Sequence, residues 1–213
     1  YNLSKKYQCN VFLKREDMQV VRSFKIRGAY HKMKQMGAEA REKGVICASA
    51  GNHAQGVAFA CSSLKTHGII YMPTTTPKQK ISKVKHFGGD WIEIRLTGDT
   101  FDDANKVALH HSDSENIPYI HPFNDEVVMA GQGTIAKEIL DEIKVPVDVL
   151  FVAVGGGGLI SGVGSYFRQK SPLTRIIAVE AEGAPALAKS LQENKLVRLE
   201  HIDSFADGIA VKV

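Results

Sequence analysis

A run of four glycines most constrains how this chain can fold. Gly155 to Gly158 follow the apolar stretch 147–154 and precede a helical pattern that begins near Leu159. Without β-carbons, this backbone can wrap closely around a ligand and adopt φ angles that other residues avoid. The free N–H groups and the dipole at the next helix start favour an anion. The arrangement therefore predicts a phosphate site, because a plain strand-to-helix turn would need only one glycine.

Two nucleotide-binding motifs use a glycine-rich loop, and the neighbouring residues test both. A P-loop closes with Lys-Ser or Lys-Thr, whereas this loop continues into Leu159-Ile160-Ser161, so a P-loop is disfavoured. A dinucleotide site needs the spacing G-x-G-x-x-G and an acidic residue about 20 positions later. Glu180 ends the next predicted strand, but Ile160 or Ser161 fills the last glycine position. An NAD-binding oxidoreductase domain remains an alternative with an imperfect motif.

A lysine lies at a second predicted helix start. The segment Ser23-Phe24-Lys25-Ile26-Arg27-Gly28-Ala29 opens a helix whose apolar residues recur at helical spacing, namely Ile26, Ala29, Tyr30 and Met33. Ser23 is a suitable N-cap, which places Lys25 in the first turn. A cation there opposes the helix dipole, so we expect its pKa to lie below the usual value of about 10.4. A lowered pKa suits an amine nucleophile, although a single lysine is more commonly a solvated surface charge.

A second loop of small residues also lies between a strand and a helix. Ser49-Ala50-Gly51-Asn52-His53-Ala54-Gln55-Gly56 follows the short strand Val45 to Ala48 and leads into an apolar helix. Its helix start provides another anion site, suited to a carboxylate. Asn52 and His53 are alternatively ordinary structural residues. Two anion sites and a lysine at a helix start together suit a ligand with a phosphate, a carboxylate and a carbonyl that an amine attacks.

These motifs carry a family resemblance. The Lys25 and Asn52 segments, Ala130-Gly131-Gln132-Gly133-Thr134, the four glycines with Leu159, and Ala206-Asp207-Gly208-Ile209-Ala210-Val211-Lys212 occur in one order. In that order the chain resembles the serine/threonine dehydratase family of fold-type II pyridoxal-phosphate (PLP) enzymes, over essentially all 213 residues. The resemblance implies loss of water from L-threonine or L-serine, which gives a 2-oxo acid and ammonia. It also implies a role in isoleucine biosynthesis and a homo-oligomer, with an amino-acid substrate.

The resemblance also assigns roles to individual residues. Lys25 matches the Schiff-base lysine that later acts as the Cα base, and Phe24 precedes it in the cofactor site. Asn52 matches the residue that hydrogen-bonds the ring hydroxyl. The remaining cofactor contacts are the phosphate-binding residues Gly155, Gly156, Gly157, Gly158 and Leu159, and the backbone of Gly208. The substrate carboxylate would lie against Ser49, Gly51, Asn52 and His53.

Two positions distinguish members of the resembling family. Serine racemases place a serine at the position of Ala50, where it acts on the opposite face of the cofactor. Alanine carries no such proton, so we expect dehydration, with a racemase-like enzyme as the alternative. Some members bind a divalent cation near Glu180, but this chain has Ala186 where they carry aspartate. Hard cations need several oxygen ligands, so we expect no metal site.

The chain alternates strand and helix, which predicts parallel sheets in an open α/β fold. The predicted strands are 11–14, 45–48, 68–72, 90–96, 118–121, 147–154 and 175–179. The resemblance implies a tryptophan synthase β-like arrangement of two lobes. Residues 1–46 and 132–213 would form a large PLP-binding domain, and residues 47–131 a small domain, with the cofactor in the cleft between them.

Composition is consistent with a globular enzyme. Hydrophobic residues make up 44% of the chain and the formal net charge is +4 without a basic block, so no nucleic-acid surface is predicted. Cys9, Cys47 and Cys61 lack metal-ligand spacing. The absence of a signal peptide or a membrane-length apolar run suggests a cytoplasmic protein. In the resembling family the serine that contacts the pyridine nitrogen lies beyond Val213, so we expect a truncated chain. An inactive fragment without cofactor is therefore a further alternative.

Overall fold

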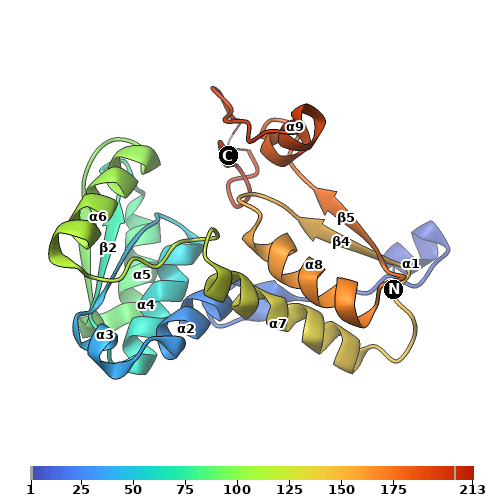
Figure 1. The fold of residues 1–213 in the computed structure, drawn as a ribbon, viewed down its shortest axis with the longest axis horizontal. Coiled ribbons are helices and arrows are strands. Elements are labelled where there is room, and N and C mark those ends of the chain that lie inside the picture. Colours follow the sequence, from blue (N-terminus) through green and yellow to red (C-terminus); the bar gives the residue numbers. More distant parts are fainter. Residues whose placement is uncertain (1, 204) are drawn as a thin grey trace.

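The computed structural model describes residues 2–203 and 205–213, which form two parallel sheets flanked by helices (Figure 1). The elements, in chain order, are α1 (Asn2–Tyr7), η1 (Glu16–Met18), α2 (Lys25–Gln35), α3 (Ala38–Glu42), β1 (Val45–Ala48), α4 (Asn52–Leu64), β2 (Gly68–Met72), α5 (Lys78–Gly88), η2 (Gly89–Trp91), β3 (Ile92–Leu96), α6 (Phe101–Glu115), α7 (Glu126–Glu142), β4 (Val149–Ala153), α8 (Gly158–Lys170), β5 (Arg175–Val179) and α9 (Ala186–Glu193). The predicted α/β class with open parallel sheets is confirmed.

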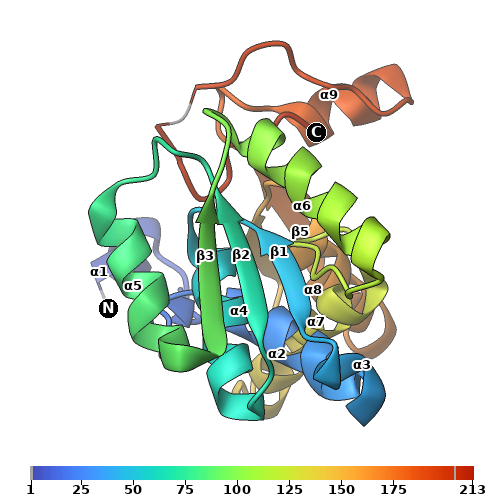
Figure 2. The ribbon, with the colours of Figure 1, turned by 90° about the vertical axis from the view of Figure 1, so that its left-hand side faces the viewer.

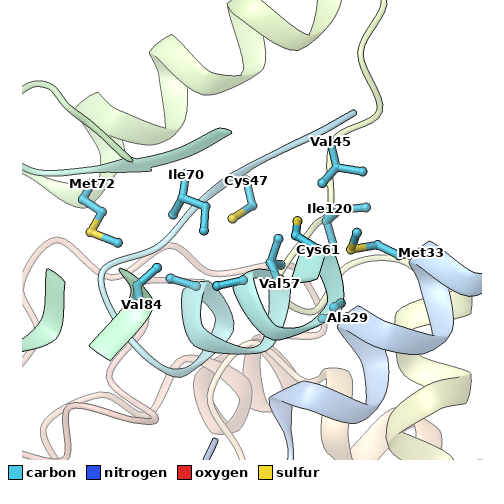
Figure 3. Close-up of a cluster of buried hydrophobic side chains, with 13 residues drawn as sticks. Ala29, Met33, Val45, Cys47, Val57, Cys61, Ile70, Met72, Val84 and Ile120 are labelled. Carbon is cyan, nitrogen blue, oxygen red and sulfur yellow. The ribbon is translucent and has the colours of Figure 1, made fainter. Parts of the chain in front are cut away.

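The first sheet has the order β1-β2-β3, with all strands parallel and Val45 paired with Gly68 (Figure 2). Alternate residues of a strand point to opposite faces. Val45 and Cys47 therefore face α4 and α5, whereas Ile46 and Ala48 pack against α6. The core between the sheet and α4 contains Val57 and other fully buried apolar side chains (Figure 3). This sandwich fixes the carboxyl end of β1, from which the Ser49–Asn52 loop departs.

The second sheet pairs β4 with β5, also in parallel, with Val152 opposite Ala178. Helix α8 follows β4 and covers one face through Val163 and Phe167, while α7 packs against both α8 and α2. Figure 1 shows α2 and α7 running between the two sheets. The two helices therefore hold the carboxyl ends of β1 and β4 in a fixed relation. No helix in residues 2–203 and 205–213 has the length and apolar character needed to cross a bilayer.

Two predicted strands are wrong. Residues 11–14 are not a strand, since Phe12 and Leu13 are exposed and the Lys14 amine pairs with Glu138 at 2.9 Å. Residues 118–121 form only a single bridge, between Ile46 and Tyr119. Pro118 in this segment and Pro122 directly after it donate no N–H to a ladder, which limits pairing. The other predicted strands are present, and 90–96 and 147–154 are shorter than expected.

Candidate functional site

Helix α2 presents Lys25 as its first residue. The Lys25 N–H donates to Ser23 Oγ at 3.3 Å, but Phe24 occupies the cap position and makes no side-chain cap, so Ser23 is not the N-cap that we expected. The Lys25 Nζ donates to the Pro122 carbonyl at 2.6 Å. It also lies 5.5 Å from the centroid of the Phe24 ring and 5.9 Å from that of Phe123. The amine is therefore enclosed by two aromatic rings and one carbonyl.

This enclosure changes the acidity of the amine. Burial lowers the pKa of Lys25 from 10.5 to about 8, because the charged form loses its water. The residue as a whole keeps some exposed surface. At pH 7 about one molecule in ten then holds a neutral Lys25 amine, compared with fewer than about one in a thousand for an ordinary lysine. Lys25 is thus suited to attack a carbonyl.

The start of α4 lies beside Lys25. Ser49 Oγ accepts the Gly51 N–H at 3.1 Å, and Asn52 is exposed as the first helical residue. The first-turn N–H groups of a helix have no partner within it, so this end can bind an anion. A β-carbon on Gly56 would lie 3.0 Å from the Lys25 carbonyl, which shows how closely α4 approaches α2.

His53 points away from this helix start and into the protein. Its Nε2 lies 2.8 Å from the Ile120 carbonyl oxygen, so that nitrogen carries the proton and donates it. Its buried Nδ1 has no hydrogen-bond partner in the described residues. Burial, together with the nearby charge of Lys25, lowers the pKa of His53 to about 3 and keeps the ring neutral. Any contact of His53 with a carboxylate would therefore use its backbone N–H.

The glycine loop connects β4 to α8. Gly157 adopts a φ of +81° at the N-cap position, a conformation that residues with a β-carbon rarely adopt. A β-carbon on Gly156 would lie 2.5 Å from the Phe123 ring, and one on Gly158 would lie 2.9 Å from the Phe123 backbone. Helix α8 then begins at Gly158, and Leu159 packs on the adjacent core. The loop thus presents the positive end of α8 next to Phe123.

Segment 120–123, which runs from the first sheet towards α7, joins these parts (Figure 1). Ile120 bonds His53, Pro122 bonds Lys25, and Phe123 covers Gly156. These contacts could not be predicted from the sequence, because two of them use backbone carbonyls, which no side-chain pattern reveals. The available signal was the pair Pro118 and Pro122, which brackets a short stretch of the chain.

Two other positions singled out in the sequence are Gly208 and Glu180. Gly208 is exposed, and no atom lies within 4 Å of the position its β-carbon would take. The neighbouring Ile209 lies against the glycine loop, where a β-carbon on Gly155 would be 3.1 Å from the Ile209 Cα. The Glu180 carboxylate accepts the N–H groups of Leu187 and Ala188, at 2.8 and 2.7 Å, and so caps α9.

These residues fit PLP. A buried amine with a lowered pKa can form an imine with the cofactor's aldehyde, and the glycine loop at the start of α8 can accept its phosphate. The start of α4, the helix that contacts the Lys25 backbone at Gly56, supplies a second anion site suited to a carboxylate. Lys25 is thus held beside both helix starts, through Gly56 of α4 and through Phe123, which covers Gly156.

Comparisons with known proteins agree with this chemistry. A family model described as "Pyridoxal-phosphate dependent enzyme" matches residues 1–213. The L-threonine dehydratase biosynthetic IlvA of Bacillus subtilis (strain 168) is 58% identical over 210 residues, which are 99% of this chain and 50% of that protein. The processed form of threonine deaminase isoform 2 from Solanum lycopersicum superposes with a TM-score of 0.95 at 49% identity, covering 99% of this chain and 60% of that one.

Maize serine racemase also has this fold. It superposes with a TM-score of 0.92 at 31% identity, covering 99% of this chain and 63% of that one. The chain spans about half the length of the curated relatives it matches, with 50% for the Bacillus subtilis protein. The match of the family model to the whole chain, together with the buried lysine and the glycine loop, leads to one conclusion: the chain belongs to the family of pyridoxal-phosphate dependent enzymes.

Proposed function

We propose that the protein containing this chain removes water from L-threonine, and from L-serine, to give 2-oxobutanoate or pyruvate and ammonia. The observation that carries the proposal is the Lys25 amine, buried beside Phe24 and Phe123 with its pKa lowered to about 8. The 58% identity to a biosynthetic L-threonine dehydratase supports the choice of substrate.

The residues of the chain would divide the work as follows. When bound, PLP supplies an electron sink for the carbanion at the substrate Cα. The first-turn N–H groups of α8 would hold its phosphate, and Asn52 would hold its ring hydroxyl. The start of α4, with Ser49 and Gly51, would hold the substrate carboxylate. Lys25 Nζ would then accept the Cα proton, for which a pKa of about 8 suits work near neutral pH.

Racemisation is the second candidate function, because the structure is similar to that of maize serine racemase. A racemase needs a proton donor on the face of the substrate opposite Lys25. Ala50 fills the position that the resemblance assigns to that donor, between Ser49 and Gly51, and its methyl group carries no exchangeable proton. Dehydration is therefore the reaction that this chain supports better.

We also propose the setting of this chemistry. Residues 1–46 and 132–213 would form the large domain and residues 47–131 the small domain, with the cofactor between them. The division is supported by the separate sheets, one formed by β1, β2 and β3 and the other by β4 and β5. We also propose that the enzyme is cytoplasmic and works as a homo-oligomer.

The test is chemical trapping of the cofactor. The protein at its full natural length is incubated with PLP and reduced with borohydride, and the modified lysine is located by peptide mass spectrometry. We expect the modification on Lys25, and 2-oxobutanoate with ammonia from L-threonine before reduction. Modification of another lysine, or no keto acid from either amino acid, would refute the proposal.

A further inference from the structure

Two segments that carry the family resemblance have no role in the proposed chemistry. These are Arg27-Gly28, just after Lys25, and the Gly131–Thr134 part of α7. In the structure they contact each other. The Gly28 N–H donates to the buried Gln132 Oε1 at 3.2 Å, and a β-carbon on Gly131 would lie 2.7 Å from the Gly28 Cα. The first turn of α2 is thus pressed directly onto α7.

Arg27 fastens this contact through all of its donors. Its Nε and Nη2 donate to Glu16 at 2.7 and 2.8 Å, and its Nη1 and Nη2 donate to Glu138, both at 2.7 Å. The remaining N–H, on Nη1, donates to Thr134 Oγ1 at 3.0 Å. A guanidinium has five N–H donors in a rigid fork, and here each has a partner. Arg27 therefore joins η1, α2 and α7 with its side chain only 12% exposed.

The Arg27 clamp, which consists of Arg27 and its partners Glu16, Glu138 and Thr134, also places negative charge at the positive start of α2. Helix α2 has no acidic residue in its first turn and no side-chain cap, while Lys25 and Arg27 bring two cations to its positive end. Such a start is unfavourable and tends to fray. Glu16 and Glu138 place two carboxylates beside it. The Arg27 hydrogen bonds in turn lower the pKa of Glu138 to about 2, so that carboxylate stays charged at all physiological pH values.

Helix α7 also packs closely against α8, the helix that follows the glycine loop. A β-carbon on Gly133 would lie 2.9 Å from the Gly162 carbonyl oxygen in α8, so these two helices also approach closely. Helix α7 therefore contacts α2 at Gly131 and α8 at Gly133, two residues later in the chain. A shift of α2 along α7 would change the distance from Lys25 to the start of α8.

We propose that Arg27 is a positioning residue for the reaction: clamped by Glu16 and Glu138, it holds the first turn of α2 so that the Lys25 amine stays buried and faces the glycine loop. The inference rests on the proposed function only in that Lys25 must be the lysine that holds PLP. Arg27 does not touch substrate or cofactor, and acts through Lys25.

The experiment compares variants by the ionisation of Lys25. Full-length protein without cofactor is treated briefly with PLP across pH 6 to 10 and reduced with borohydride. Modification of the Lys25 peptide is plotted against pH, and modification of the peptide with the exposed Lys83 is recorded in the same samples to follow the reagent. The variants are Arg27→Met and the milder Glu16→Gln. The matched control is Arg95→Met, which removes another two-pronged pair, with Glu93 on β3.

The inference predicts a shift in the pH midpoint that a loss of stability alone does not produce. Wild type should label Lys25 with a midpoint near pH 8, and Arg27→Met should raise the midpoint by at least about one pH unit, since a frayed helix start exposes the amine to water. Labelling at pH 7 then falls about tenfold. Glu16→Gln should shift the midpoint in the same direction by less, and Arg95→Met should leave it unchanged.

Each outcome decides the matter. An unchanged midpoint in a folded Arg27→Met protein overturns the positioning role and leaves the proposed function intact. An equal shift in Arg95→Met also overturns it, since general loosening would then explain both results. If Arg27→Met does not fold, Glu16→Gln decides by the same criterion. If wild type does not modify Lys25 preferentially, both the proposed function and this inference fail.

Discussion

Replacing the reactive lysine should make the cofactor-free protein more stable. The pKa of Lys25 is about 8 in the folded chain and about 10.5 when the side chain is exposed. Burying its charge therefore costs about 3 kcal/mol of folding free energy at neutral pH. Lys25→Met keeps the length of the side chain and removes the charge. It leaves the Pro122 carbonyl without its donor at 2.6 Å, a loss of about 1 kcal/mol. We therefore expect a net gain of about 2 kcal/mol.

The pH dependence of this gain identifies its cause. Below pH 8 both states of the wild type hold the proton, so the folded state carries the full penalty. Between pH 8 and 10.5 the folded state releases the proton and the unfolded state keeps it, so the penalty disappears. The advantage of Lys25→Met should therefore be complete below pH 8 and absent above about pH 10.5.

Thermal unfolding of the apoprotein measures the effect. For a chain of 213 residues, about 2 kcal/mol corresponds to an increase of about 4–8 °C in Tm at pH 7. Lys83→Met is the control, because Lys83 is exposed on α5 and its replacement should change Tm by little. A Tm for Lys25→Met that is unchanged or lower at pH 7, or a gain that persists at pH 10.5, would refute the reasoning that the site holds a strained, desolvated amine.

Three further predictions concern the glycine loop, the racemase alternative and the thiols. Gly157→Ala should cost the apoprotein about 1–2 kcal/mol of stability because of its φ of +81°, and PLP titration should show a larger loss of binding free energy. Equal losses in the two measurements would favour a purely structural turn. Gly156→Ala should also destabilise the fold, because its β-carbon would meet Phe123. Wild type should form negligible D-serine from L-serine and Ala50→Ser should raise it, as chiral chromatography of the products will show. Cys9 should react with a thiol reagent at once, and Cys47 and Cys61 only after unfolding, because both are buried and burial raises the pKa of Cys61 to about 12; rapid titration of three thiols in native protein would contradict this.

The sequence predicted the fold where apolar runs were short and clearly bounded. Strands 45–48, 68–72 and 175–179 have the predicted limits because small or polar residues flank each apolar run. Strand β3 starts at Ile92 because Gly89–Trp91 before it form a separate turn of 3-10 helix. Residues 11–14 begin with three apolar residues but form no strand. Pairing depends on a neighbouring edge that local sequence does not encode.

For the candidate site, sequence reasoning found the groups and missed what holds them. Lys25 and the glycine loop were predicted from helix starts and glycine chemistry, and the structure brings them together through Phe123. The lowered pKa of Lys25 was expected from the helix dipole, but burial is its cause in the structure. The burial of Lys25 depends on segment 120–123, in which Pro122 lies 97 positions after Lys25 in the chain. No local pattern reports such a distant contact.

The site as a whole concentrates unfavourable features that the surrounding structure must offset. Lys25 is a desolvated cation, His53 keeps a buried nitrogen without a partner in the described residues, and Gly157 holds a left-handed backbone. The desolvated cation and the unpaired nitrogen cost free energy, whereas the left-handed backbone is open to glycine and would cost free energy only after substitution. The offset comes from contacts outside the site, chiefly the five-donor clamp of Arg27 on Glu16 and Glu138. Substitutions in the clamp should therefore lower stability, whereas Lys25→Met within the site should raise it. The two changes in stability have opposite signs because Lys25 is an unfavourable group within the site, whereas the Arg27 clamp stabilises the structure around it.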